Sequence, residues 1–236
     1  MIPVLTKEQA YKLDKDTIES GHLSQAELMD NAGRAVAQFF CEKIKNPFNK
    51  KVVVVCGKGN NGGDGVITHS YLKKYNVSSK IVFTEENHCH SKLLKKYKIS
   101  KNDYSIINDK TKLDNYDWVI DGIFGIGLSR DLNKKYQKII NDLNDNKNII
   151  SIDIPSGLFA SSNNSKNFVK SKHTVTFGYT KLGHYLEPIN SLTIKDIGFK
   201  PVISAFAKIE YLDICRILKK FHKKNNVHKY SKGRVD

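Results

Sequence analysis

The chain has 236 residues, 39% of them hydrophobic, which is enough for the core of one large α/β domain or two small ones. Its formal net charge is +15, but the lysines are spread along the sequence and form no basic stripe with aromatic residues, so we expect no specific nucleic-acid partner. No apolar run reaches membrane-spanning length and residues 1–20 are too charged for a signal peptide, so we expect no membrane partner and a cytoplasmic location, with mitochondria or another organelle as the alternative.

The predicted elements alternate between helix and strand. Two helices come first, and Ser24 with Glu27 is predicted to form a capping box at the start of the second. The predicted helices cover 6–20, 24–45, 63–76, 88–98, 131–145 and 208–221, and the predicted strands cover 51–56, 80–84, 104–107, 117–121, 148–153, 173–178 and 191–197. Strands that alternate with helices are typical of an α/β fold with a mostly parallel central sheet.

The segment 52–65 joins an apolar strand to a glycine-rich turn and a helix. Four consecutive valines predict a strand buried on both faces, and five glycines follow within nine positions. A helix that begins after such a turn can bind a phosphate, because its first N–H groups are free and glycines allow close approach. The spacing of Gly57, Gly59 and Gly62 matches the dinucleotide fingerprint, yet no acidic residue is expected to end the strand 80–84. A phosphate site and a tight structural turn are therefore both open readings of the glycines.

Two further strand ends carry acidic residues. Asp121 and Asp153 each end an apolar strand, and Ser156 follows directly after Pro155. Because the carboxyl ends of parallel strands lie at one edge of the sheet, these side chains and those of the segment 60–64 are expected to converge across one cleft. Each residue alone is also typical of a loop cap or Asx-turn, but the two aspartates together favour a site.

Six short motifs follow one another along the chain. They are LMDNAGRAVA at 28–37, CGKGNNGGDG at 56–65, DGIFGIGL at 121–128, DIPSG at 153–157, TVTFG at 174–178 and DIG at 196–198. In this order the pattern resembles the YjeF N-terminal domain family, the NAD(P)HX epimerases, over about residues 6–200. The resemblance implies a three-layer α/β/α Rossmann-like fold that usually forms a homodimer.

The same resemblance implies the reaction and the site. The substrate would be NAD(P)HX, whose R form is converted to the S form at C6 of the hydrated nicotinamide ring. The dinucleotide-binding residues would be Asn60, Asn61, Gly62, Gly63, Asp64, Gly125, Ile126, Gly127, Leu128, Ser129, Arg130, Asp131 and Asp153. Asp153 would be the catalytic residue at the reacting ring, where a carboxylate suits both proton transfer and charge stabilisation. A potassium ion would be bound by Asn61, Asp121 and Ser156 with backbone carbonyls.

The sequence departs from the family pattern near the rim of the expected cleft. Phe159 stands where the family usually has Asp, and the polar segment 159–167, expected to be a mobile loop, lacks the usual glycine. Asp131 replaces a frequent Pro after Arg130 and adds a negative charge near the expected phosphate site. The first two changes affect the shape of the rim, and the third is expected to weaken binding slightly.

The expected domain covers residues 1–220. Residues 221–236 are expected to be a linker or the start of a truncated C-terminal domain, because 227–235 resembles the opening of the NAD(P)HX dehydratase domain. A disordered basic tail is the alternative.

Two other functions stay open at this point. One is a non-catalytic YjeF-like module for dimerisation or RNA binding, which the net charge allows, and the other is a dinucleotide sensor without turnover. The set Asn61, Asp121, Asp153 and Ser156 favours the enzyme over the module, because a scaffold does not need it. The residues favour neither NADHX nor NADPHX.

Overall fold

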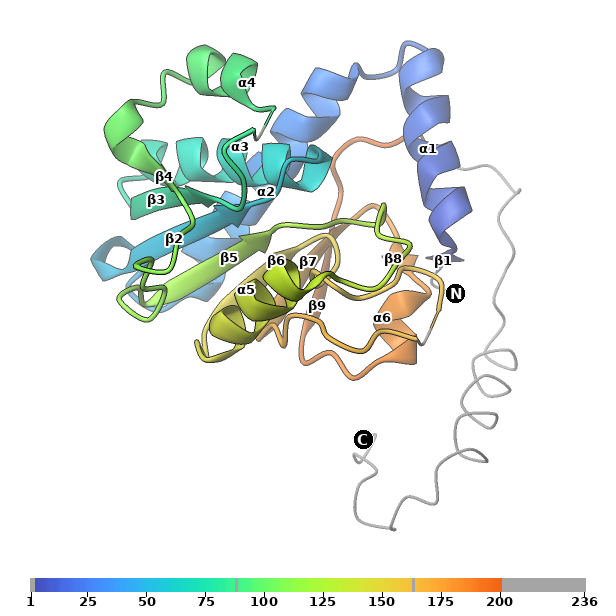
Figure 1. Ribbon diagram of the computed structural model, residues 1–236. Coiled ribbons are helices and arrows are strands. Elements are labelled where there is room, and N and C mark those ends of the chain that lie inside the picture. Colours follow the sequence, from blue (N-terminus) through green and yellow to red (C-terminus); the bar gives the residue numbers. More distant parts are fainter. Residues whose placement is uncertain (1–2, 88, 163, 201–236) are drawn as a thin grey trace.

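Seven parallel strands form the central sheet of the protein (Figure 1). The structure is a computed structural model that describes residues 3–87, 89–162 and 164–200. In spatial order the strands are β4 (Tyr104–Ile106), β3 (Ser78–Phe83), β2 (Lys51–Cys56), β5 (Trp118–Gly122), β6 (Ile149–Ile152), β7 (His173–Phe177) and β9 (Leu192–Lys195). The predicted α/β class with a parallel sheet is confirmed.

Helices cover both faces of this sheet. They are α1 (Lys7–Glu19), α2 (Gln25–Lys43), α3 (Asn60–Lys74), α4 (Ser91–Lys96), α5 (Lys134–Asn144) and α6 (Gly183–Leu186), with two short 3-10 helices, η1 (Pro47–Asn49) and η2 (Lys101–Asp103). Alternate side chains of β2 point to opposite faces, so Val52 and Val54 join the core beneath α2 and α3 while Val53 and Val55 join the core beneath α5. The result is a three-layer α/β/α arrangement.

The helix starts follow the local sequence. The Ser24 hydroxyl accepts a hydrogen bond from the Glu27 N–H at 3.2 Å, and the Glu27 carboxylate accepts one from the Ser24 N–H at 2.8 Å, which confirms the predicted capping box. A second box joins Thr6 and Gln9 at the start of α1. No helix in the described part of the chain is long and apolar enough to cross a membrane.

The order of the strands changes direction beside β2. From β2 the chain moves outward to β3 and β4, and then returns to the other side of β2 as β5. The connections that leave β2 and β5 therefore run to opposite sides, which makes this edge the topological switch point at which doubly wound α/β proteins bind ligands. The start of α3 and the segment 123–133 lie at this point.

Some predicted boundaries were wrong. The helix expected at 63–76 begins at Asn60, so most of the glycine-rich segment is its first turn. The helix expected at 88–98 is the shorter α4. The helix predicted at 208–221 and the tail 221–236 lie outside the described residues.

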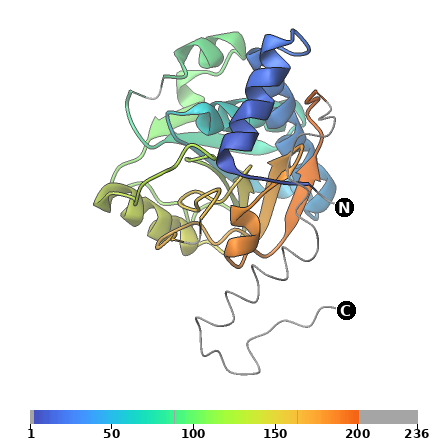
Figure 2. The same ribbon diagram turned by 90° about the vertical axis from the view of Figure 1, so that its right-hand side faces the viewer.

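Two short strands were not predicted. β1 (Val4–Leu5) pairs in parallel with β8 (Thr180–Lys181), with Leu5 opposite Lys181. This ladder ties the start of the chain to the segment after β7, and Figures 1 and 2 show α1 next to β8 as a result.

Candidate active site

The first turn of α3 packs tightly against the segment that follows β5. A Cβ on Gly57 would lie 2.0 Å from the Ile123 carbonyl oxygen, and one on Gly62 would lie 1.8 Å from the Gly57 carbonyl oxygen. A Cβ on Gly63 would lie 2.8 Å from Met29 Sδ of α2. These three glycines are therefore required by protein packing, whereas a Cβ on Gly59 would meet no atom of the described residues within 4 Å.

The start of α3 nevertheless offers free donors. Gly59 is its N-cap and supplies no side-chain cap, and the first helical hydrogen bond runs from the Gly63 N–H to the Gly59 carbonyl. The N–H groups of Asn60, Asn61 and Gly62 precede that bond, so they have no partner within the helix. Together with the helix dipole they suit a phosphate.

Asp121 is a fully buried anchor at the end of β5. Its two carboxylate oxygens accept four hydrogen bonds: from the Ser156 hydroxyl at 2.5 Å, the Ser156 N–H at 2.9 Å, the Ser151 hydroxyl at 2.8 Å and the Ile123 N–H at 3.3 Å. Burial raises the pKa of Asp121, and the hydrogen bonds from Ser156 and Ser151 oppose that rise. Asp121 thus ties the end of β5 to the loop after β6.

Asn61 and Ser156 both contact the backbone of Phe124. The Asn61 side-chain N–H donates to the Phe124 carbonyl at 2.9 Å, and the Ser156 hydroxyl accepts from the Phe124 N–H at 2.8 Å. Asn61, Asp121 and Ser156 therefore lie together, as the sequence predicted. The side-chain oxygen atoms of these three residues carry one negative charge in total, that of the Asp121 carboxylate. Such a set of metal ligands fits a hard monovalent cation.

Asp153 lies next to this cluster, directly after β6, and forms a buried ion pair. Its backbone has a left-handed φ of 62°, fixed by the hydrogen bond from its N–H to the Val175 carbonyl at 2.7 Å. Lys181 Nζ lies 2.6 Å from the Asp153 carboxylate, and the two side chains are only 6% and 14% exposed, respectively. The Thr176 hydroxyl donates to the same oxygen at 2.9 Å.

These contacts keep Asp153 ionised. Burial raises the pKa of Asp153, but the charge and hydrogen bond of Lys181, with smaller contributions from His184 and Thr176, together outweigh burial, so the pKa lies below its ordinary value. Burial lowers the pKa of His184 to about 4, so its ring is neutral near pH 7. His184 Nδ1 accepts from the Lys181 N–H at 3.1 Å, which leaves Nε2–H to donate to the Asp153 carbonyl at 3.0 Å. Lys181, Thr176 and His184 together hold the Asp153 carboxylate ionised and in a fixed orientation.

Two more carboxyl groups belong to the same neighbourhood. Asp64 of α3 has its pKa raised well above the ordinary value by burial and by the charges of Asp153 and Asp14. Asp14 of α1 has its pKa raised to about 6 by burial and by Asp153, with Lys181 opposing. Three carboxyl groups and one lysine thus share this end of the cleft.

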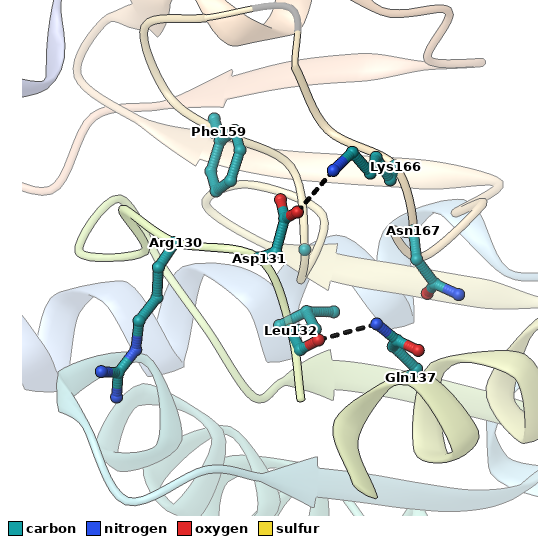
Figure 3. Close-up of a pocket in the computed structure, with 8 residues that line it drawn as sticks. Arg130, Asp131, Leu132, Gln137, Phe159, Lys166 and Asn167 are labelled. Carbon is teal, nitrogen blue, oxygen red and sulfur yellow. Dashed lines mark hydrogen bonds and ion pairs between the residues drawn. The ribbon is translucent and has the colours of Figure 1, made fainter. Parts of the chain in front are cut away.

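Residues 129–132 and the loop after β6 line a pocket at the rim (Figure 3). Arg130, Asp131, Phe159 and Lys166 line it. Lys166 Nζ lies 2.7 Å from the Asp131 carboxylate, and both side chains are exposed. The extra charge that Asp131 brings is therefore paired with a lysine of the loop.

Sequence reasoning missed the residues that surround Asp153. Lys181, Thr176 and His184 all follow or belong to β7, the strand beside β6. The TVTFG motif marked that strand, and the rule that parallel strands end at one edge could have directed attention to the residues after it. Asp14 gave no signal, because nothing local places α1 at this edge.

An acidic residue after β3 was also overlooked. Glu85 follows Thr84, and its carboxylate accepts a hydrogen bond from the Tyr136 hydroxyl at 2.6 Å. Its other oxygen lies 3.9 Å from Lys58 Nζ in the turn before α3. Glu85 therefore ties the turn 57–59 to α5.

Comparison with known proteins finds a matching family and similar sequences. The family described as YjeF-related protein N-terminus matches residues 25–183. The chain belongs to this family. The NAD(P)H-hydrate epimerase of Oenococcus oeni is 34% identical over 82% of this chain and 96% of its own length, and that of Entamoeba histolytica is 33% identical over 65% and 69%.

Longer YjeF relatives carry a similar region. The bifunctional NAD(P)H-hydrate repair enzyme Nnr of Dictyoglomus turgidum is 36% identical over 66% of this chain, which spans 31% of that enzyme. The crystal structure of the yeast protein ynu0 (YNL200c) has a TM-score of 0.68 at 20% identity and covers 86% of this chain and 97% of the yeast chain. That likeness supports the same fold.

Proposed function

We propose that this YjeF domain is an isomerase that converts R-NAD(P)HX to S-NAD(P)HX. The observation that carries the proposal is the buried Asp153–Lys181 pair, which fixes an ionised carboxylate beside the free start of α3. Curated relatives at 33–34% identity are named NAD(P)H-hydrate epimerases. A family of epimerases and an oriented carboxylate at the ligand edge support the same reaction.

The proposed substrate lies along this ligand edge. Its phosphates face the first turn of α3, residues 60–64, and the segment 125–131, and its hydrated nicotinamide ring faces Asp153. The free N–H groups of α3 bind the phosphates, and the nearby Arg130 adds a positive charge at the rim.

Asp153 is proposed to act on the reacting ring through its charge. C6 carries both a hydroxyl group and the ring nitrogen, so inversion passes through either an iminium or an opened ring. In both routes positive charge or a mobile proton develops near C6. A carboxylate that Lys181 and Thr176 hold ionised stabilises that charge from a fixed position.

A potassium ion is proposed at Asn61, Asp121 and Ser156. The oxygen donors fit such an ion, and the Phe124 carbonyl adds a backbone oxygen to the same cluster. When bound, the ion would offset the negative charge of the substrate phosphates beside Asp121. The protein groups themselves set the shape of the cleft through the four hydrogen bonds of Asp121.

Incubation with purified R-NADHX and R-NADPHX tests the function. Chromatography is expected to show the S epimer forming faster with protein than without it, and faster in potassium than in tetramethylammonium buffer. Binding of either compound without turnover would instead support a dinucleotide sensor. Selective binding of single-stranded RNA at physiological salt, without dinucleotide binding, would support the RNA-binding module.

We also propose a homodimer and a longer parent enzyme. The family resemblance supports the dimer, which light scattering of the purified chain tests.

The bifunctional Nnr relatives support a fused dehydratase domain after residues 221–236, beyond an epimerase domain at 1–220. Fusing such a domain to the chain should add ATP- or ADP-dependent dehydration without reducing epimerisation.

A further inference from the structure

We infer that Asp14 of α1 is a second catalytic carboxyl group, which donates a proton to the C6 hydroxyl and later takes one from the incoming water. The inference rests on the proposed epimerase function and assigns a task that Asp153 is poorly suited to perform. Lys181 and Thr176 already donate to one Asp153 oxygen, which favours the charged form. A separate group is therefore needed to carry the proton.

The fold places α1 against the reaction centre. The β1–β8 ladder puts Leu5 opposite Lys181, and α1 begins two residues later. Leu13 is buried in a cluster that includes Ile126 of the segment 125–131. Lys7 Nζ also donates to the Gly127 carbonyl at 3.1 Å. Figure 2 shows α1 with β1 at its lower end, on the side of the molecule that faces the viewer.

Asp14 is half-buried and chemically available at this position. Within the described residues, no hydrogen bond reaches its carboxyl group, in contrast to the four that Asp121 accepts and the two on Asp153. The groups that act on Asp14 electrostatically are Asp153, Lys181 and Asp64, with Tyr11 on the same helix. A carboxyl group without partners can exchange a proton with a ligand.

The carboxyl groups of Asp14 and Asp153 have pKa values that are shifted in opposite directions. The pKa of Asp14 is raised to about 6, whereas that of Asp153 lies below its ordinary value. Neighbouring groups whose pKa values are pushed apart divide into a proton carrier and a fixed charge. Asp64 is a weaker candidate, because it lies in the segment 60–64 that is proposed to face the phosphates rather than the ring. Asp14 can both give and take a proton near neutral pH.

The proposed step conserves atoms and electrons. The C6–O bond breaks, its electron pair leaves with the oxygen, and that oxygen takes the Asp14 proton and departs as water. The lone pair of the ring nitrogen forms the C6=N bond of an iminium, whose charge faces Asp153. Water then attacks the opposite face of C6, the C=N π pair returns to nitrogen, and the attacking water gives a proton back to Asp14.

Asp14→Asn tests the assignment, with Asp16→Asn as the matched control. Asp16 is on the same helix, exposed and paired with Lys12. We measure kcat/KM for R-NADHX from pH 5 to 9, after subtracting the rate without protein. The wild type is expected to lose activity about tenfold per pH unit above about 6, as the acid ionises. Below about pH 6, Asp14→Asn is expected to be about 100-fold slower than the wild type, and its rate is expected to lack this limb, while Asp16→Asn keeps the wild-type profile.

Folding of the variant is checked by thermal unfolding. The folded protein holds the Asp14 proton more tightly than the unfolded chain, so ionisation of Asp14 destabilises the fold as pH rises through about 6. Asp14→Asn should therefore be at least as stable as the wild type at pH 8. An active wild type with an unchanged Asp14→Asn rate or pH limb overturns the inference and leaves the proposed function intact. An inactive wild type overturns the proposed function itself.

Discussion

Asp121 and Asp153 end neighbouring strands of one sheet and are both largely enclosed by protein, but their surroundings differ. Asp121 accepts four hydrogen bonds from serines and backbone, and burial raises its pKa. Asp153 has a lysine at 2.6 Å, and its pKa lies below the ordinary value. The first joins two loops, and the second presents a charge to the cleft. Two aspartates at the same kind of position, the carboxyl end of an apolar strand, thus differ in pKa because different residues surround them.

The largest expected effect is on activity. Asp153→Asn should lower kcat for epimerisation by about 100-fold or more, because the amide keeps the shape but carries no charge. Asn also tolerates the left-handed φ of this residue. Turnover is measured by chromatography and dinucleotide binding by calorimetry, and binding should persist. Turnover equal to the wild type would remove Asp153 from the mechanism.

Removal of Lys181 should show how much an unpaired charge on Asp153 destabilises the fold. Lys181→Met leaves a buried carboxylate without its cation, which should lower the free energy of unfolding by about 3–5 kcal/mol at pH 7. In the wild type, the stability that ionised Asp153 contributes is present above the unfolded pKa of about 4 and is lost as pH falls through the lower folded pKa.

The Lys181→Met variant should show the opposite dependence of stability on pH. Without Lys181, the pKa of Asp153 rises, so stability decreases as pH increases from about 4 to 7. Urea unfolding at pH 4, 5.5 and 7 checks this, with Lys166→Met as the control because its ion pair is exposed. A deficit of the same size at every pH would mean that Lys181 contributes through packing alone.

Asp121 should matter more for the architecture than for the chemistry. Asp121→Ala leaves the Ser156 N–H and the Ser151 hydroxyl without their acceptor, so the free energy of unfolding should fall by about 3 kcal/mol. Dinucleotide affinity and the potassium dependence of the melting temperature should weaken together. If potassium still stabilises the variant as it does the wild type, the ion is bound elsewhere.

The smallest effect is expected at the rim. Lys166→Met removes the partner of Asp131 and should weaken dinucleotide affinity by about two- to fivefold, since an exposed pair contributes at most about 1 kcal/mol. The double variant with Asp131→Asn should restore the wild-type affinity, because it removes the unpaired charge. Calorimetric titration of all three proteins makes the comparison. Equal affinity in Lys166→Met would show that the charge of Asp131 does not reach the phosphates.

Much of the fold could be predicted because its signals are local. The four valines of β2, the capping box at Ser24 and the alternation of elements are each determined by neighbouring residues and by burial. The grouping of Asn61, Asp121 and Ser156 also followed from sequence, because parallel strands end at the same edge of a sheet. The order of the six motifs along the chain resembled the family that the comparison then matched.

Tertiary structure decided the rest. Gly57 and Gly62 are needed where two loops touch, which their spacing does not reveal. The buried pairing of Lys181 depends on β8 reaching β1, and the position of Asp14 depends on the helix that follows β1. A two-residue strand has too little pattern to be predicted, and its partner lies at the other end of the domain. The sequence alone therefore determines the scaffold and its ligand edge, whereas contacts between distant segments determine which carboxyl group holds a charge and which can hold a proton.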